Sequence, residues 1–179
     1  MTEELNSWLK PEEALSRFEE PQKTLLNKKD SDFKEKVTRY GFVIENIGFL
    51  IAENTLSEVV KNTKIYPIPN TRNWMKGLVN LRGNLVPVYD FSVLLGLVTE
   101  NNHYNNLLIL GKDSLSVGVL IGGLPRPCNI ENWQKLDELP SGVAGLEEYV
   151  SGAYLADDIV WMDFDQRRYF ESIKQQIVV

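Results

Sequence analysis

The sequence predicts an all-β protein built from two related halves, each with about five short strands. From Thr38 onward, short runs rich in Val, Ile, Leu and aromatic residues alternate with polar turn segments, which is the pattern of strands joined by hairpins. Two such series follow each other, and each ends on a second pair of strands after a polar connection that contains proline. Strands of this number and length suit a small barrel, because closure leaves few edges unpaired.

The first half begins and ends with a hairpin. "YGFVIENIGFLIAE" turns at Glu45-Asn46 and can place one set of apolar residues on a single face, namely Phe42, Ile44, Phe49 and Ile51. "WMKGLVNLRGNLVPVYDF", residues 74–91, closes this half. The second half repeats the form with "LLILGKDSLSVGVLIG", whose turn is Gly111-Lys112-Asp113, and then with "YVSGAYLADDIVWMDF".

The closing segments of the two halves also resemble each other residue by residue. With a gap of two residues, the alignment pairs Trp74 and Gly77 with Tyr149 and Gly152, Gly83-Asn84 with Asp157-Asp158, and Asp90-Phe91 with Asp163-Phe164. Self-similarity of this kind indicates duplication of one β unit, although short apolar strands also resemble each other by chance. Two barrels side by side would leave a groove between them.

The first 37 residues differ in composition from the rest of the chain. They carry 16 charged side chains, against 28 in the other 142 residues, which indicates a polar N-terminal arm over residues 1–37 and a packed domain over residues 38–179. Apolar residues at helical spacing occur in the arm, namely Leu5, Trp8, Leu9, Leu15 and Phe18. Pro11 and Pro21 interrupt any helix there, so a short helix and disorder both remain open.

Net charge and its distribution narrow the class of partner. The formal net charge of −6 argues against a nucleic-acid binder and against binding to an anionic membrane, since both need clustered cations. Between Val59 and Tyr89 the chain has five cations and no acid, whereas Glu131 to Asp165 contains nine acids and one base, Lys135. The folded protein is therefore expected to have two unlike electrostatic ends, unless these charges serve only solubility.

Composition also indicates a cytoplasmic protein. Hydrophobic residues make up 43% of the chain, yet no apolar run approaches the ~18 residues that span a bilayer. No basic-then-apolar leader opens the sequence. The single cysteine, Cys128, excludes an internal disulfide and agrees with a reducing compartment.

No residue pattern indicates catalysis, a metal site or a cofactor. His103 is the only histidine and lies in the polar segment "ENNHYNN", and Cys128 has no sequence feature that would make it a nucleophile. The carboxylates Asp157-Asp158 and those at 163–165 fit a turn and a strand end better than a Ca²⁺ or Mg²⁺ site. "IGGLPRP" lacks the Gly-Lys-Ser/Thr of a phosphate loop. We therefore expect a protein that acts by binding.

Arg82 stands out because a hairpin turn favours Gly, Asn or Asp and needs no cation. The surrounding "WMKGLVNLRGNLVPVYDF" resembles the central signature of CheW-like coupling proteins: a glycine, then Asn-x-Arg-Gly, then a Pro-Val-x-Asp strand. "AENTLSEVVKNTKIYPIP" resembles that family's preceding strand with its x-Glu-Val element. The resemblance covers roughly residues 38–170 in layout and is strongest over 42–91; Trp74 and the long arm look most similar to the twitching-motility, PilI-type branch.

This resemblance implies a fold of two intertwined five-stranded SH3-like barrels with a short C-terminal helix. It implies a non-enzymatic adaptor that couples the cytoplasmic tip of a methyl-accepting chemoreceptor to the CheW-like regulatory domain of a histidine kinase, in control of type IV pilus twitching motility. The adaptor would be recruited from the cytoplasm to membrane-associated receptor arrays, where it could assemble into rings. In the family, the positions of Glu58 and Arg82 face each other and shape the binding surface.

The candidate partner-binding residues follow from this resemblance. They are the apolar Leu56, Val59, Trp74 and Leu78, the polar Glu58, Asn80 and Arg82, and the signature glycine Gly77. Trp74 would be either an interface residue or a core aromatic that closes the barrel. The segment 121–127 departs from the family, and so does Ser92-Val93 after the Asp-Phe pair. The alternative is a small OB- or SH3-like barrel that binds a ligand or nucleic acid, which needs exposed aromatics along a basic groove.

Overall fold

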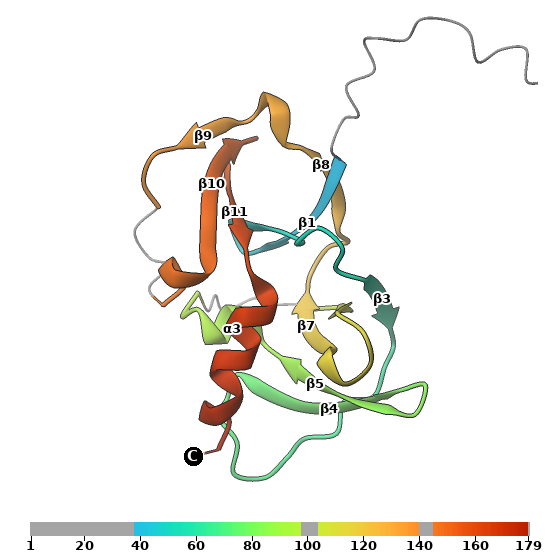
Figure 1. Ribbon diagram of the computed structural model, residues 1–179. Coiled ribbons are helices and arrows are strands. Elements are labelled where there is room, and N and C mark those ends of the chain that lie inside the picture. Colours follow the sequence, from blue (N-terminus) through green and yellow to red (C-terminus); the bar gives the residue numbers. More distant parts are fainter. Residues whose placement is uncertain (1–37, 98–103, 140–144, 179) are drawn as a thin grey trace, which may run out of the picture. The chain divides into compact units, whose positions relative to one another are not determined.

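The computed structural model describes residues 38–97, 104–139 and 145–178, and the N-terminal arm and His103 lie outside them. The described chain forms two antiparallel-rich sheets with a short C-terminal helix (Figure 1). The five-stranded sheet has the order β3 (Ser57–Lys61), β6 (Asn106–Leu110), β7 (Val117–Ile121), β5 (Asn84–Tyr89), β4 (Met75–Leu81). The six-stranded sheet has the order β8 (Arg126–Asn129), β1 (Thr38–Ile44), β2 (Ile47–Leu50), β11 (Ile159–Phe164), β10 (Val150–Ala156), β9 (Gln134–Leu136).

Short helices connect and close these strands. They are α2 (Phe91–Leu94), α3 (Gln166–Ile173), and the 3₁₀ turns η2 (Asp113–Leu115), η3 (Ile130–Asn132), η4 (Glu147–Tyr149) and η5 (Lys174–Gln176). The predicted all-β class with a short C-terminal helix is confirmed. One sheet has the five strands expected, and the other has six because the segment between β7 and β10 contributes both β8 and β9. We call the two sheets the five-strand barrel and the six-strand barrel.

The two halves of the sequence exchange their opening hairpins. The hairpin β1–β2 of the first half pairs with β11 of the second half, and β6–β7 of the second half pairs with β5 of the first. Both of these exchanges are parallel pairings, β2 with β11 and β5 with β7, whereas the hairpins themselves are antiparallel. Each barrel therefore contains strands from both halves, so neither half can close its barrel alone.

The strand register corrects part of the alignment between the halves. Trp74 and Tyr149 are equivalent, as expected, because each backbone carbonyl accepts a hydrogen bond of 2.8 Å from an aspartate N–H. Those aspartates are Asp90 and Asp165, which both cap the following helix, so the predicted match of Asp90 with Asp163 is wrong. Asp163 instead lies within β11. The chance repetition of Asp-Phe had shifted the alignment by two residues.

The expected bend at Arg82-Gly83 is confirmed, but the alignment of the two closing turns with each other is corrected by one position. The residues at the tip of the β4–β5 hairpin are Arg82-Gly83, between Leu81 and Asn84, and they correspond to Asp157-Asp158 at the tip of β10–β11. The departing segment 121–127 still contributes a strand, since Arg126 and Pro127 belong to β8. β8 is an edge strand, and there a proline's missing N–H leaves no ladder bond unmade.

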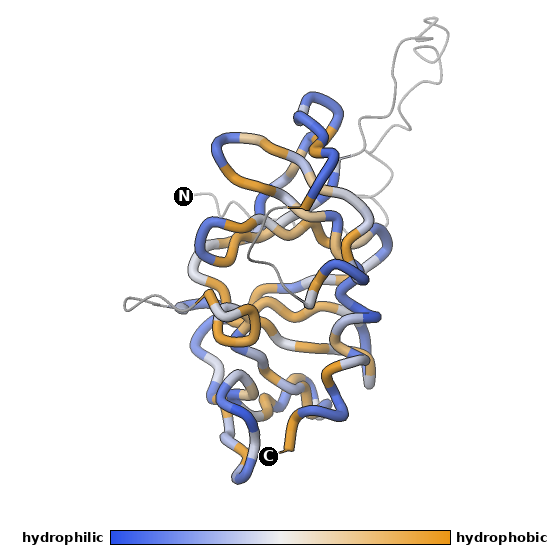
Figure 2. Tube along the Cα trace, turned by 90° about the vertical axis from the view of Figure 1, so that its left-hand side faces the viewer, coloured by the Kyte–Doolittle hydropathy of each residue, from blue (hydrophilic) through white to orange (hydrophobic). Residues whose placement is uncertain are grey.

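Three apolar clusters hold the fold. The largest lies between the barrels and contains the predicted face of the first hairpin, Phe42, Ile44, Phe49 and Ile51, all buried. Smaller clusters fill each barrel, around Val79, Val86 and Val88 in one and around Leu50, Cys128 and Trp161 in the other. Figure 2 shows hydrophobic stretches of the chain running through the middle of the described domain and hydrophilic stretches at many of its outer bends.

Helix α3 ties the two barrels together. It follows β11 and runs toward the strands of the five-strand barrel (Figure 1). Tyr169 and Phe170 pack in the central cluster, where Phe170 stacks on Tyr89 with ring centroids 5.2 Å apart. Beyond the helix, the Arg72 N–H donates to the Ile177 carbonyl at 2.9 Å. The C-terminal segment is thus fixed to the connection between β3 and β4.

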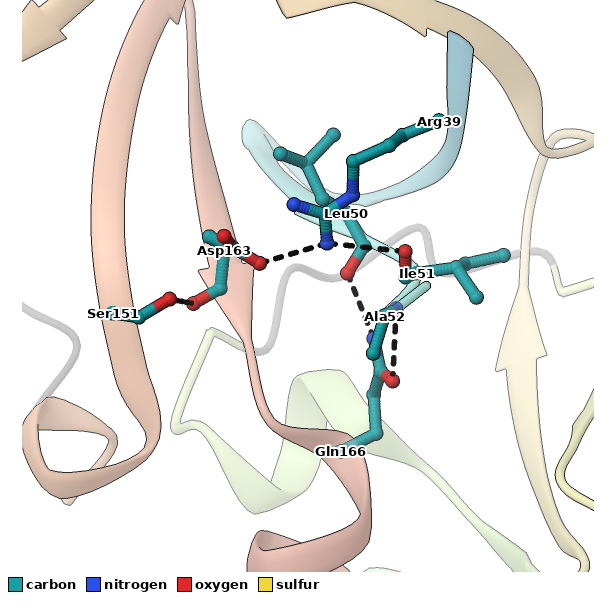
Figure 3. Close-up of polar contacts among 7 residues, drawn as sticks. All are labelled: Arg39, Leu50, Ile51, Ala52, Ser151, Asp163 and Gln166. Carbon is teal, nitrogen blue, oxygen red and sulfur yellow. Dashed lines mark hydrogen bonds and ion pairs between the residues drawn. The ribbon is translucent and has the colours of Figure 1, made fainter. Parts of the chain in front are cut away.

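A buried polar network joins β1, β2, β11 and α3 (Figure 3). Arg39 donates to Asp163 Oδ1 at 2.7 Å and to the Ile51 carbonyl at 3.1 Å. The Gln166 amide donates to the Leu50 carbonyl at 2.7 Å and accepts from the N–H of Ala52 at 3.3 Å. Asp163 raises the pKa of Arg39 through the hydrogen bond and the charge, against the lowering effect of burial. The network fixes the end of β2 against the start of α3.

Candidate partner-binding surface

Arg82 occupies a strained turn position on the surface. Its φ is +51° and that of Gly83 is +90°, the pattern of a two-residue type I′ turn. This turn suits the right-handed twist of the flanking strands, but it places a long side chain in a backbone region where Gly, Asn or Asp is usual. The Gly83 N–H donates to Asn80 Oδ1 at 2.9 Å, so Asn80 supports the turn.

Arg82 and Glu58 form an ion pair across the open side of the five-strand barrel. Arg82 Nη2 lies 2.9 Å from Glu58 Oε2, and the two side chains are 77% and 34% exposed. Glu58 belongs to the edge strand β3, and Arg82 belongs to the tip of the β4–β5 hairpin. Exposed pairs of this kind add about 0–1 kcal/mol to stability. The pair therefore contributes little to folding and presents a fixed charge pattern to solvent.

An apolar side chain and a cleft adjoin this ion pair. Leu56 precedes β3 and is 60% exposed. The cleft has a volume of about 390 Å³ and is lined by Leu56, Glu58, Arg82 and the loop residues Lys112 and Asp113, among others. We call Leu56, Glu58, Asn80 and Arg82 the Arg82 surface. Sequence reasoning missed the contribution of Lys112 and Asp113, because their loop belongs to the exchanged hairpin of the second half.

The other predicted site residues lie deeper. Val59 and Leu78 are half-buried and pack against the central cluster. Trp74 is only 9% exposed and its ring centroid lies 5.9 Å from that of Tyr89, which is the position of a core aromatic. Gly77 has φ +137°, and a Cβ there would lie 2.1 Å from the Tyr66 carbonyl oxygen. Gly77 thus allows the β3–β4 connection to pair with Leu78.

A larger groove lies beside the Arg82 surface. It has a volume of about 880 Å³ and is lined by the connection before β3, the β6–β7 loop, η4 and α3. Leu56 and Lys112 line both the groove and the smaller cleft, so the two are continuous at these residues. The groove between the halves was predicted, but the part that α3 plays in it was not, since nothing in the helix sequence shows which surface it faces.

The remaining candidates for chemistry occupy structural positions. Cys128 is buried in the six-strand barrel, and this burial raises the pKa of its thiol. Asp157 and Asp158 form a turn, and Asp165 caps α3 by accepting from the Arg168 N–H at 3.1 Å. Within residues 38–97, 104–139 and 145–178, no three His, Cys, Asp or Glu side chains are grouped to hold a metal ion. No helix in that part of the chain has the length and apolarity to span a bilayer.

The opposite charges predicted for the two halves fall on different sheets. The basic stretch contains β3, β4 and β5 of the five-strand barrel, whereas the acidic stretch contains β9, β10 and β11 of the six-strand barrel. Lys61, Lys64 and Arg72 are exposed, whereas Lys76 forms an ion pair of 3.1 Å with the buried Asp90. The exposed cations are therefore available to a partner, and Lys76 is engaged within the domain.

Comparison with known proteins identifies related chains. The family model described as "CheW-like domain" matches residues 40–174. The chemotaxis protein CheW of Helicobacter pylori is 27% identical over 124 residues, which cover 69% of this chain and 74% of that protein. The chemotaxis protein CheW of Thermotoga maritima is 24% identical over 80 residues, 45% of this chain, and the alignment spans 53% of that protein, about half its length.

A solved structure shares the fold. The crystal structure of the scaffolding protein TtCheW from Thermoanaerobacter tengcongensis superposes with a TM-score of 0.58 at 20% sequence identity. The match covers 75% of this chain and 92% of that one. At this identity the likeness concerns the arrangement of strands.

Proposed function

The chain belongs to the CheW-like domain family, and we propose that it is a non-enzymatic adaptor that couples the cytoplasmic tip of a chemoreceptor to a histidine kinase. The names of its relatives support this proposal: two are chemotaxis proteins and the related structure is that of a scaffolding protein. The two partners would be the methyl-accepting receptor and the regulatory, CheW-like domain of the kinase.

The Arg82 surface is the observation that carries the proposal. Its arginine stands at φ +51° where Asn or Gly would be less strained, and its ion pair with Glu58 adds little to stability. Because this arrangement adds little to the stability of the fold, we infer that it serves the binding of a partner. Leu56 supplies exposed apolar area beside the charges, and apolar area flanked by oriented charges is how binding surfaces combine affinity with specificity.

Charge reversal at Arg82 tests the proposal. We expect Arg82→Glu to change the free energy of unfolding by no more than about 0.5 kcal/mol, because the residue is exposed at a hairpin tip. We expect the same change to weaken binding to a receptor tip fragment or to the kinase regulatory domain at least tenfold. Affinities would be measured by titration calorimetry with each purified partner, and stability by urea unfolding.

Arg167→Glu is the matched control. Arg167 is 72% exposed and pairs with Glu171, so its reversal disturbs a comparable surface ion pair outside the Arg82 surface. It is expected to leave both affinities unchanged. Unfolding of Arg82→Glu, or normal binding of both partners by it, would remove the assignment.

We assign the adaptor to a system that controls type IV pilus twitching motility. The support is the resemblance of Trp74 and the long arm to the PilI-type branch. The twitching and flagellar assignments are distinguished by co-purification, in which the protein is offered the kinase and receptor of each system. We expect it to retain the pair of the twitching system. Exclusive capture of the flagellar pair would contradict this assignment while leaving the adaptor role intact.

We further propose that the adaptor and the kinase regulatory domain alternate in a ring or array. The support is the separation of exposed cations and acids onto different barrels, since unlike ends favour heterologous contacts. The contact should weaken between 0.1 M and 1 M salt, over which the Debye length falls from about 10 Å to about 3 Å. Lys61→Glu with Lys64→Glu should weaken it too; Lys76 is left unchanged because its reversal would place two carboxylates together at Asp90. Affinity independent of salt and of both reversals would contradict it.

A further inference from the structure

Strand β5 has an apolar outer face that is only partly covered. Val86 and Val88 belong to the apolar cluster inside the five-strand barrel. Because side chains alternate along a strand, Leu85, Pro87 and Tyr89 lie on the opposite, outer face. Exposure decreases along this face, from Leu85, which is 67% exposed, through the half-buried Pro87 to the fully buried Tyr89. One end of an apolar face is therefore open to solvent.

Helix α3 covers the buried end of this face. Its Phe170 stacks on Tyr89 with ring centroids 5.2 Å apart. The helix is amphipathic, since Phe170 and Ile173 are buried whereas Arg167 and Glu171 are exposed. Figure 1 shows the tip of the β4–β5 hairpin extending to the side, away from α3. The fold thus already packs an amphipathic helix on one end of this face.

Two further residues widen the open end. Leu78 pairs with Pro87 across the hairpin, and Tyr66 of the β3–β4 connection pairs with Leu78. Directly paired residues share a face, so these three side chains form a row across three neighbouring segments. Tyr66 is 53% exposed. We call Tyr66, Leu78, Leu85 and Pro87 the outer strip. None of the four lines the cleft at Arg82 or the larger groove, so the strip is a separate surface.

The charges next to the outer strip are positive. The connection that carries Tyr66 also carries the exposed Lys64 and Arg72, and residues 59–89 contain no acid. Lys64 Nζ lies 5.1 Å from the centroid of the Tyr66 ring. Within the described part of the chain, neither Lys64 nor Arg72 forms an ion pair. A partner that covers the strip is therefore favoured by negative charge beside its apolar residues.

A partner has to use the face of the hairpin here, because the edge of β4 is occupied. The Tyr66 N–H donates to the Leu78 carbonyl, and the Leu78 N–H donates to the Tyr66 carbonyl, each at 2.8 Å. An added strand would need these backbone groups, whereas a helix needs none of them. Neighbouring strands are about 4.8 Å apart and a helix advances about 5.4 Å per turn. A helix that lies across the strands therefore sets roughly one side chain per turn against each of them.

We propose that the outer strip docks an acidic amphipathic helix of a partner protein, which lies across the β4–β5 hairpin. Apolar side chains, one per turn, contact the strip, and carboxylates on the flank of the helix face Lys64. This contact is additional to those with receptor and kinase, because no residue of the strip belongs to the Arg82 surface. The small number of apolar residues indicates a weak interface of the transient class.

Three synthetic helical peptides of about four turns test the proposal with the full chain. The first has one leucine per turn on one face, flanked by glutamates; the second has lysine in place of every glutamate; the third has the composition of the first with its leucines spread around the helix. Fluorescence anisotropy of labelled peptides at low salt measures binding. The first should bind at least tenfold more tightly than the other two. Equal binding of all three, or no binding of the first at about 1 mM protein, would overturn the proposal.

Leu85→Asp and Leu124→Asp form a matched pair of variants. Both leucines are exposed, by 67% and 60%, and Leu124 lies just before β8 in the six-strand barrel. Leu85→Asp should weaken binding of the acidic peptide at least tenfold, because it removes apolar area and adds a like charge. Leu124→Asp should leave that affinity unchanged. Urea unfolding checks that both variants are folded, and normal peptide binding by Leu85→Asp would show that the strip is not the site.

Reversal of Lys64 tests the sign of the partner. Lys64→Glu should weaken binding of the glutamate peptide and strengthen binding of the lysine peptide. Lys174→Glu is the control, because Lys174 is exposed in η5 outside the strip, and it should change neither affinity. An unaltered preference between the two peptides in Lys64→Glu would contradict an acidic partner.

Failure of this inference is distinguishable from failure of the adaptor role. The peptide titrations contain neither receptor nor kinase, so peptides that fail to bind leave the proposed function standing. A chain that binds the acidic peptide through the outer strip but binds neither receptor nor kinase would keep this inference and remove the proposed function.

Discussion

Where the six-strand barrel buries Arg39 against Asp163, the five-strand barrel buries Leu107 beside Val88. The strand pairing makes these positions equivalent. The paired residues Ile109–Gly118–Val88 of the five-strand barrel match Gly41–Leu50–Asp163 of the six-strand barrel, and Leu107 and Arg39 each lie two residues before the first of these. In the five-strand barrel the apolar pair flanks Gly118, within 3.0–3.3 Å of where its Cβ would be. The same strand arrangement therefore accommodates either an ion pair or two aliphatic side chains at these two equivalent positions.

The comparison shows that the fold does not require a buried ion pair at this position, since one barrel has it and the other has an apolar pair. Two charges lose hydration when they are buried together, and a well-packed apolar pair avoids that cost. The ion pair of the six-strand barrel adds a hydrogen bond to the Ile51 carbonyl, beside the contacts of Gln166 with Leu50 and Ala52. It thereby connects the barrel interior to α3, a link that Leu107 and Val88 do not provide.

Replacing the ion pair by its apolar counterpart should give the largest effects. Arg39→Leu leaves Asp163 partly buried without its cation and is expected to destabilise by about 2–3 kcal/mol. Asp163→Val alone should lower the stability by at least as much, because it leaves the Arg39 guanidinium without its anion and the Arg39 side chain is only 7% exposed. The double change copies the five-strand barrel and should recover most of the loss. Urea unfolding of the three variants measures this cycle.

Some loss should remain in the double variant, since the Ile51 carbonyl loses its donor, which costs about 1 kcal/mol. A double variant no more stable than either single one would show that the two barrels are not interchangeable at this position.

Alanine should destabilise the protein more at Gly77 than at Gly152, the counterpart of Gly77 in the six-strand barrel. Gly77→Ala forces a Cβ against the Tyr66 carbonyl at φ +137°, so we expect a loss of at least about 1 kcal/mol. At Gly152 the nearest atom to a Cβ is the Tyr154 hydroxyl oxygen at 3.6 Å, so Gly152→Ala should stay within about 1 kcal/mol of the wild type. Thermal unfolding compares them, and equal losses would contradict the assigned role of the Tyr66 contact.

Tyr89 of the five-strand barrel and Phe164 of the six-strand barrel occupy equivalent positions in the two closing hairpins. Burial raises the pKa of Tyr89 from 10.0 to about 12, and among the described residues its hydroxyl has no hydrogen-bond partner. Because the folded pKa exceeds the unfolded one, this tyrosine favours the folded state most below pH 10, and that contribution disappears as the pH rises from about 10 to about 12.

Tyr89→Phe copies the six-strand barrel and should therefore weaken the alkaline decline in stability. At neutral pH we expect the variant to equal the wild type or to exceed it by about 1 kcal/mol, because an unsatisfied hydroxyl leaves the core. Stability is measured by urea unfolding at pH 7 to 12. An unchanged pH profile would show that Tyr169, whose pKa burial also raises to about 12, or the loss of lysine charge dominates.

The smallest expected effect on stability concerns the two turns. Arg82→Asn gives the type I′ turn a preferred residue and should stabilise by a few tenths of a kcal/mol, up to about 0.5. Asp157→Asn should change little, since Asp already tolerates this backbone region. Arg82→Asn should nevertheless bind receptor and kinase more weakly. A variant that is both more stable and fully active would show that the strain at Arg82 serves no partner.

Much of the fold follows from local pattern. Apolar alternation predicted the hairpins and the buried face of Phe42, Ile44, Phe49 and Ile51, because side chains alternate between the two faces of a strand. The turn position of Arg82 followed from the residues of the hairpin and is confirmed by its strand register. Its pairing with Glu58 followed from the family resemblance and is present as an ion pair of 2.9 Å. The match of Arg82 with Asp157 was not found, because a chance repeat of Asp-Phe shifted the alignment of the two closing hairpins.

The sequence by itself determined the strands of the main hairpins, the apolar face of the first hairpin, and the turns at Glu45-Asn46 and Arg82-Gly83, since these depend on residues close together in the chain. Only the tertiary structure decided that the halves exchange hairpins, that Trp74 faces the core, and that Arg39 meets Asp163, 124 positions away. Local alternation encodes the buried face of a strand and not its partner. Partner and register are selected by the packing of segments far apart in the sequence, which no local pattern records.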